Sequence, residues 1–304
     1  MKTSLEHLPE RKQRELARVV EIIHTEFSDK LSGGTAAFKQ NGRIFKIILF
    51  GSYARGTFVD EPHTMKGYRS DYDVLVIVNS KKLAEPEYWD KATDRLMWEA
   101  GIETPVSVIV HGVREVNKFL RDGQYFFSDI RREGVVLYEF DDRPLATPKL
   151  LTRQQAYGIA KRHYTARFRV VDTFAESAVF RLQKDDALGT AFMLHQAIEQ
   201  AYSALLLTLT NYSPASHNLK FLRGLAEGQD LQLAEAWPRD QHRYQSWFNT
   251  LNEAYVKARY SEHYEISQEA LTWLIARTSI LYELVKVICE AHLVKLEKAS
   301  NSAD

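Results

Sequence analysis

The stretch that decides the fold reads Phe50-Gly51-Ser52-Tyr53-Ala54-Arg55-Gly56 and resumes, after a polar gap, as Ser70-Asp71-Tyr72-Asp73-Val74-Leu75-Val76-Ile77-Val78. An apolar run of strand length precedes it, and Gly51 ends that run where a residue without a side chain lets backbone amides approach a phosphate. Side chains two residues apart on a strand face the same side, so we expect Asp71 and Asp73 to point together. Paired carboxylates suit a hard cation such as Mg²⁺, whose shell is completed by water and substrate phosphates. The sequence therefore predicts a site for a metal-bound nucleotide.

In this order, the motifs resemble the signature of the DNA polymerase β-like nucleotidyltransferases, particularly the minimal nucleotidyltransferase group. The resemblance covers about residues 30 to 140 and rests on Gly51-Ser52, Arg55-Gly56 and Ser70-Asp71-Tyr72-Asp73. It implies that Gly51 and Ser52 hold a nucleoside triphosphate such as ATP, and that Asp71 and Asp73 bind the catalytic Mg²⁺. Arg55 follows the turn directly, so we expect it either to contact the triphosphate and the leaving pyrophosphate or to pair with Asp71.

The chain departs from the family pattern at the third carboxylate. Members usually supply one from a following strand, but the segment from residue 105 to 111 contains no acid. Ser107 or Ile109 is expected to occupy that inward position, and Glu103 lies just before the strand. A missing third carboxylate removes a metal ligand and a general base for the attacking hydroxyl. The chain is then expected to be a slow enzyme or to bind a nucleotide without turning it over.

The segment from residue 57 to 69 is longer than in the most compact members of the group. Its polar side chains include His63, Lys66, Tyr68 and Arg69. A loop at the rim of a phosphate site suits a lid, and an ordinary surface loop is the alternative.

Composition excludes several classes of protein. Lys plus Arg equals Asp plus Glu, 40 against 40, so the basic excess typical of nucleic-acid-binding proteins is absent and nucleic acid is not favoured as a partner. One cysteine, Cys289, rules out an intramolecular disulfide and lies in an apolar helical pattern. Neither a signal peptide nor an apolar run of membrane length is evident, so we expect a soluble, cytoplasmic protein.

The hydrophobic pattern changes character near residue 145, which predicts an α+β protein of two domains, residues 1–144 and 149–304. The first half alternates expected helices, about 5–31, 86–100 and 113–121, with expected strands, 44–50, 72–79, 106–111 and 134–140. Two prolines in residues 141–148 indicate a linker. The second half reads at helical period throughout, over about 153–184, 187–210, 217–227, 240–258 and 267–297.

The helical half resembles a second family, the HEPN domains (higher eukaryotes and prokaryotes nucleotide-binding), which often accompany minimal nucleotidyltransferases. The resemblance rests on residues 192–201 and 216–222 and covers most of 152–297. Many HEPN domains are ribonucleases with an Arg followed by His after four to six residues. The helical half has no such pair, because Arg259 and His263 are separated by three residues. Arg18 and His24 have the spacing but lie on the N-terminal helix.

Four residues of the helical half are candidates for ligand contact or packing. His195 lies on an amphipathic helix and is expected to be a hydrogen-bonded packing residue. His217 follows Ser216 at a helix start, so helix capping and ligand contact both remain open. Arg259 and His263, with Tyr260 and Tyr264, are expected in a loop that contacts a nucleotide or an acceptor. Aromatic residues including Trp247, Phe248, Tyr255 and Trp273 are expected to form a face that mediates a homodimer or covers the α/β domain.

Together these features predict a Mg²⁺-dependent nucleotidyltransferase that moves AMP from ATP to a hydroxyl of a small molecule or protein. Asp71, Asp73 and Arg55 are the expected catalytic residues, and Gly51, Ser52, His217, Arg259 and His263 the expected nucleotide contacts. One alternative is a nucleotide-binding regulatory protein derived from a toxin–antitoxin pair. The other is a HEPN ribonuclease restrained by its nucleotidyltransferase domain.

Overall fold

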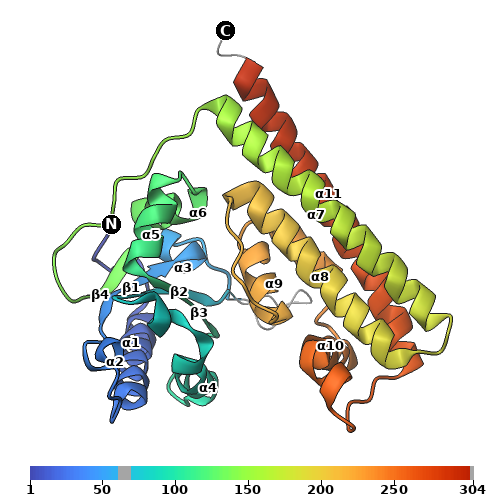
Figure 1. Cartoon of the computed structure of the whole chain (residues 1–304), viewed down its shortest axis with the longest axis horizontal. Helices are drawn as coiled ribbons and strands as arrows, with labels where there is room; N and C mark the ends of the chain where they lie inside the picture. The colour runs from blue at the N-terminus through green and yellow to red at the C-terminus, as the bar shows by residue number, and fades with distance from the viewer. Residues whose placement is uncertain (61–69, 302–304) are drawn as a thin grey trace. The chain divides into compact units, whose positions relative to one another are not determined.

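The computed structural model describes residues 1–60 and 70–301. The lid expected from His63, Lys66, Tyr68 and Arg69 therefore lies outside the described residues. The chain divides into two compact units, an N-terminal unit that ends at Leu150 and a helical unit that begins at Leu151 (Figure 1).

The N-terminal unit is built on a four-stranded sheet with the order β3-β2-β1-β4. Its strands are β1 (Ile44–Phe50), β2 (Tyr72–Val78), β3 (Val106–Gly112) and β4 (Val135–Glu139). β1 runs antiparallel to both β2 and β4, whereas β2 and β3 are parallel. The two central strands, β1 and β2, are almost entirely buried, which explains why they read as continuous apolar runs. The predicted strands are confirmed to within one residue at either end.

The helices of this unit are α1 (Glu10–Leu31), α2 (Ala37–Gln40), α3 (Gly51–Arg55), α4 (Asp90–Trp98), α5 (Val113–Arg121) and α6 (Tyr125–Glu133). The apolar stripe of α1 is buried at Leu16, Val19, Ile23 and Phe27, as its spacing predicts. The predicted start of this helix near residue 5 is wrong, because Pro9 precedes the first helical residue. A further helix, α6, was not predicted from the sequence, and it buries Phe126, Phe127 and Ile130.

The helical unit consists of α7 (Arg153–Leu182), α8 (Ala187–Thr210), α9 (Leu219–Glu227), α10 (His242–Tyr260) and α11 (Gln268–Asn301), with short 3₁₀ segments between them. α8 is apolar on nearly all sides and forms the buried centre of the unit. The caps follow sequence chemistry, since the Thr152 hydroxyl accepts from Gln155 N and the Asp186 carboxylate accepts from Gly189 N.

The α+β class is confirmed, with a mixed sheet and its helices before residue 150 and a helical region after it. Cys289 is buried in α11, as its apolar surroundings predict. Among residues 1–60 and 70–301, no helix is both long and apolar enough to cross a membrane.

Candidate functional site

The turn from β1 into α3 depends on a close approach between Gly51 and Asp73. Gly51 has φ +71°, a conformation that residues with a Cβ rarely adopt. A Cβ built at Gly51 would lie 2.1 Å from Oδ2 of Asp73, which opposes Phe50 across the β1–β2 ladder. Only glycine therefore leaves room for the Asp73 carboxylate beside the turn.

Three side chains meet at the start of β2. Asp71 directly precedes the strand and Asp73 is its second residue. Ser107 of β3 is the register partner of Asp73 in the parallel pair, and its hydroxyl donates to Oδ2 of Asp71 over 3.4 Å. Ser107 thus takes the position expected for a third carboxylate. Ile109 is only 4 % exposed. Glu103 forms an ion pair with Arg11 of α1.

The two carboxylates interact electrostatically. Burial raises the pKa of Asp73 well above its usual range, and the nearby charge of Asp71 raises it further, while Arg55 opposes the shift. That Asp71 and Asp73 point together to share one ligand stays a prediction. A cation bound beside the pair would offset this repulsion and the cost of burying the Asp73 charge.

This chemistry fits Mg²⁺. Two adjacent oxygen donors beside a glycine turn match its preference for one or two carboxylates plus phosphate and water. Within the part of the chain that the structure describes, no group of three or more His, Cys, Asp or Glu residues could hold a metal ion. If Mg²⁺ binds at this place, Asp71 and Asp73 are the residues that would hold it, with the remaining ligands supplied by substrate and solvent.

Ser52 and Arg55 lie on α3, immediately after the turn. The Ser52 hydroxyl has no protein partner among residues 1–60 and 70–301, so it is free to contact a ligand. The Arg55 guanidinium lies 4.0 Å from the Glu133 carboxylate at the end of α6, and its charge acts on Asp73. The contact with Glu133 decides neither of the two predicted uses of Arg55. Its role at the triphosphate and its pairing with Asp71 both stay predictions.

Hydrogen bonds that the sequence did not predict join the residue before Asp71 to the segment that follows α3. Ser70 N donates to Val59 O over 2.8 Å, and Val59 N donates to the Ser70 hydroxyl over 3.0 Å, which fixes the two chain segments side by side. Lys12 of α1 is 7 % exposed and contacts the Asp60 carboxylate at 3.4 Å. No local pattern reveals this arrangement, since it joins a helix to a loop about fifty residues away.

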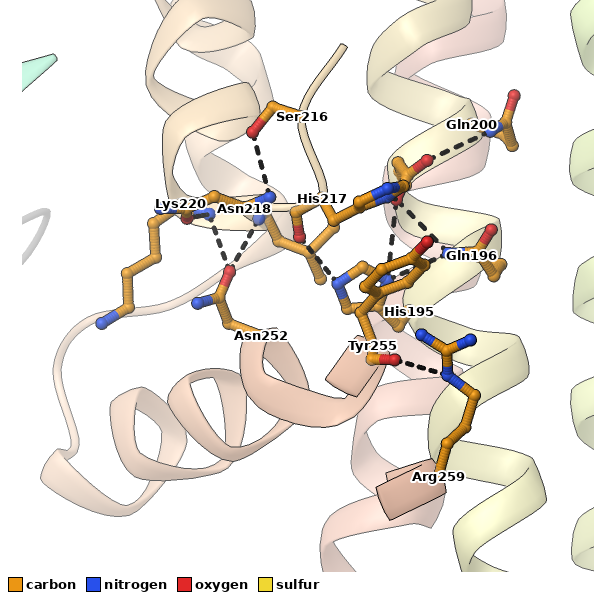
Figure 2. A network of polar contacts seen from close by, with 12 residues as sticks. His195, Gln196, Gln200, Ser216, His217, Asn218, Lys220, Asn252, Tyr255 and Arg259 are labelled. Atoms are coloured by element: carbon orange, nitrogen blue, oxygen red, sulfur yellow. Dashed lines mark hydrogen bonds and ion pairs between the residues drawn. The ribbon is translucent and has the colours of Figure 1, made fainter. Parts of the chain in front are cut away.

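A separate polar cluster lies in the helical unit (Figure 2). His195 is fully buried on α8 and bonds through Nε2 to the His217 carbonyl oxygen at 2.9 Å, which confirms it as a packing residue. His217 Nδ1 lies 2.8 Å from Oε2 of Glu199, which is one helical turn after His195. The N-cap of α9 is Asn218, so His217 is not the capping residue. Glu199 was missed, although its spacing of four from His195 places both on one face of a helix.

Arg259 and His263 are not brought together. Arg259 and Tyr260 lie in the last turn of α10, so their predicted place in a loop is wrong. The Arg259 guanidinium packs over the ring of Tyr255, 4.5 Å from its centroid. No interaction joins the His263 side chain to His217 or Arg259 in the described part of the chain. Arg18 forms ion pairs with Glu21 and Glu99. These contacts do not support a ribonuclease-like role of Arg18 together with His24.

Each of the two units matches a known protein family. A model of the nucleotidyltransferase domain matches residues 35–121, and a model of the HEPN domain matches residues 168–288. The chain is also 33% identical over 100 residues to a protein of Methanocaldococcus jannaschii that bears the provisional name protein adenylyltransferase MJ0604. The matched region is 33% of this chain and 84% of that protein. The chain therefore belongs to the nucleotidyltransferase-domain family and carries a HEPN domain after its nucleotidyltransferase domain.

Proposed function

We propose that this nucleotidyltransferase moves AMP from ATP to a hydroxyl group of a protein or small molecule, with Mg²⁺ as cofactor. The observation that carries the proposal is the Asp73 carboxylate packed against Gly51 at the end of β1, next to Asp71. A metal bound by these two carboxylates would lie directly beside a turn suited to phosphate. The resemblance to a protein whose provisional name is protein adenylyltransferase supports AMP as the transferred group.

Each residue of the site has a proposed role that follows from its chemistry. Gly51 and the free hydroxyl of Ser52 contact the β- and γ-phosphates, and Arg55 supports the leaving pyrophosphate with its planar fork. Asp71 and Asp73 hold the metal, which would neutralise charge on the phosphates. Because Ser107 is uncharged and donates to Asp71, the general base for the acceptor hydroxyl comes from another residue or from the acceptor's own surroundings.

The same observation at Ser107 favours a second function, a nucleotide-binding regulatory protein with weak catalysis. A hydroxyl in place of a carboxylate lowers the negative charge available to a second cation. Binding of Mg²⁺ and ATP then survives while transfer is slow.

One experiment separates the two functions. The protein is incubated with ATP labelled on the α-phosphate and Mg²⁺, alone and with cell extract, and labelled products are separated by gel and by thin-layer chromatography. The proposed transferase labels an acceptor, whereas the regulatory protein binds ATP in calorimetry without labelling anything.

The matched variant is Asp71→Asn with Asp73→Asn, which keeps the side-chain shapes and removes both charges. We expect it to lose transfer and to bind Mg-ATP at least tenfold more weakly. Equally tight Mg-ATP binding by this variant would show that the site is wrongly assigned.

A further inference from the structure

The buried face of α1 carries two charged residues where its apolar stripe would continue. Lys12 and Glu15 are 7 % and 3 % exposed, and they precede Leu16 and Val19 on the buried side of the helix. Removing two opposite charges from water is costly, and an apolar pair of similar volume is often equally stable or more stable at such a place. Stability therefore does not explain this pair, but the contacts that it makes are directional.

Lys12 contacts two segments that border the candidate metal site. Its ammonium group donates to the Thr104 hydroxyl over 2.5 Å and lies 3.4 Å from the Asp60 carboxylate. Thr104 is buried just before β3, the strand that carries Ser107, and Asp60 lies in the segment that follows α3. One buried ammonium group therefore ties α1 to both segments.

Glu15 contacts the first residue of β2 and the same residue before β3. Its Oε2 accepts from the Tyr72 hydroxyl over 3.2 Å and from the Thr104 amide over 3.4 Å, and it lies 3.8 Å from the Lys12 ammonium group. Beside these contacts, the Tyr72 amide donates to Pro105 O over 2.8 Å. The starts of the two parallel strands are thus joined both by their own backbones and through the side chains of α1.

The network lies on the face of the sheet opposite to the candidate metal site. Tyr72 and Asp73 are neighbours on β2, so their side chains point to opposite faces. Tyr72 is fully buried in the hydrophobic cluster that includes Leu16 of α1. Asp73 lies on the other face, and its register partner Ser107 shares that face. A shift between the starts of β2 and β3 would therefore move Asp73 relative to Ser107.

We propose that Lys12 and Glu15 are positioning residues for the metal site, because they hold the starts of β2 and β3 together from behind the sheet. The inference rests on the proposed function, since it takes Asp71 and Asp73 as the ligands of Mg²⁺. Metal-binding carboxylates depend on surrounding groups that fix their orientation, and loss of such groups typically lowers metal affinity about ten- to a hundredfold. Here the surrounding groups act through the strand backbones that carry the carboxylates.

The test replaces the buried pair in the full chain by apolar residues of similar size, Lys12→Met with Glu15→Leu. We expect this double variant to resist urea at least as well as the natural protein, because the buried charges are gone. Binding of Mn²⁺ in the presence of ATP, followed by electron paramagnetic resonance, should nevertheless weaken at least tenfold. Unchanged affinity for Mn²⁺ overturns the proposal.

A second ion pair of the same helix provides the matched control. The Arg18 guanidinium lies 2.7 Å from the Glu99 carboxylate, so this pair ties α1 to the end of α4. Arg18→Met with Glu99→Leu should leave the affinity for Mn²⁺ unchanged, and a loss equal to that of the first double variant contradicts the proposal. If the first double variant does not fold, Thr104→Val removes only the hydroxyl that accepts from Lys12. It should still weaken Mn²⁺ binding at least threefold, and unchanged binding overturns the proposal.

Hydrogen exchange of the metal-free protein separates this inference from the proposed function. In the Lys12→Met and Glu15→Leu variant, the Tyr72 amide should exchange at least tenfold faster, whereas the Val76 amide in the middle of β2 should keep its rate. Unchanged exchange at Tyr72 overturns the positioning role, whether or not the natural protein binds a metal. If the natural protein binds no Mn²⁺ while Tyr72 still exchanges faster in the variant, the metal assignment fails and the hold of α1 on the strand starts stands.

Discussion

At the scale of single residues, the nucleotidyltransferase site depends on the absence of one methyl group. Gly51 is both in a left-handed conformation and in contact with the Asp73 carboxylate. These two requirements are separable, because other glycines of the chain meet one of them or neither.

We expect Gly51→Ala to abolish Mg-ATP binding and to destabilise the protein by more than the cost of a left-handed residue alone, about 1 kcal/mol. The added Cβ would displace the Asp73 carboxylate from the turn. Urea unfolding and calorimetry measure the two effects.

Two glycines provide the controls. Gly33 has φ +74° with nothing within 4 Å of a built Cβ, so Gly33→Ala reports the conformational cost alone. Gly101 also has open space and no positive φ, so Gly101→Ala should be nearly neutral. A Gly51→Ala variant that matches Gly33→Ala in stability and still binds Mg-ATP would contradict the close-approach argument.

A second residue-scale prediction concerns His195. Burial lowers the pKa of His195 from 6.5 to about 4, because desolvation disfavours the charged ring. The folded state therefore favours neutral His195, and this contribution is complete above pH 6.5 and is lost as the pH falls from 6.5 to 4. The loss relative to a non-titrating variant is about 3 kcal/mol.

The measurement is the free energy of urea unfolding between pH 7 and pH 4 for the natural protein and for His195→Gln, whose amide still donates to the His217 carbonyl oxygen. The difference between the two should change in favour of the variant as the pH falls. Parallel curves would mean that His195 does not titrate in this range.

At the scale of secondary-structure elements, the register between β2 and β3 decides which residue replaces the third carboxylate. The pairing of Asp73 with Ser107, and the hydrogen bond from Ser107 to Asp71, select Ser107 over the buried Ile109. The third carboxylate is thus absent because a serine, Ser107, occupies its position on β3.

We expect Ser107→Asp to raise the affinity for Mg²⁺ in the presence of ATP at least threefold and to increase the rate of label transfer, because a third carboxylate adds a metal ligand. Ser107→Asn is the matched control, with the same shape and no charge. If both variants behave alike, the position does not face the metal site. A natural protein already turning over at about ten per second would show that the base comes from elsewhere.

At the scale of the whole molecule, an exposed apolar row on α11 points to self-association. Ile280, Val287 and Val294 are spaced by seven residues and are 39%, 59% and 48% exposed. The aromatic face expected to mediate a homodimer is largely used inside the unit, since Phe248 is buried and Tyr255 stacks on His217. A seven-residue apolar repeat is typical of helices that pair along their length.

We expect a homodimer formed through α11. Light scattering at micromolar concentration should return twice the mass of one chain, and Val287→Glu should return the monomer mass, because it places a charge in the shared row. Val256→Glu on α10 is the control, since Val256 is equally exposed at 58% but lies outside the row. A natural protein that scatters as a monomer removes the prediction.

The sequence by itself determined the class of the fold and most element boundaries. It also determined that Gly51 follows β1 and that Asp71 and Asp73 lie at the start of β2. These depend on short-range rules, namely the strand and helix periods and the need for glycine at a turn. The same rules failed where a local signal was weak or ambiguous, at the start of α1, at α6 and at the end of α10.

Only the tertiary structure decided which distant groups meet. Contact of Asp73 with Gly51 and of Ser107 with Asp71 follows from strand register, which a sequence leaves open until the strands pair. His217, Glu199 and Arg259 come from three segments whose proximity is set by the packing of α8 and α10, and no spacing along the chain encodes it. The physical reason is range: periodicity acts over one or two helical turns, whereas these contacts join residues eighteen or more positions apart.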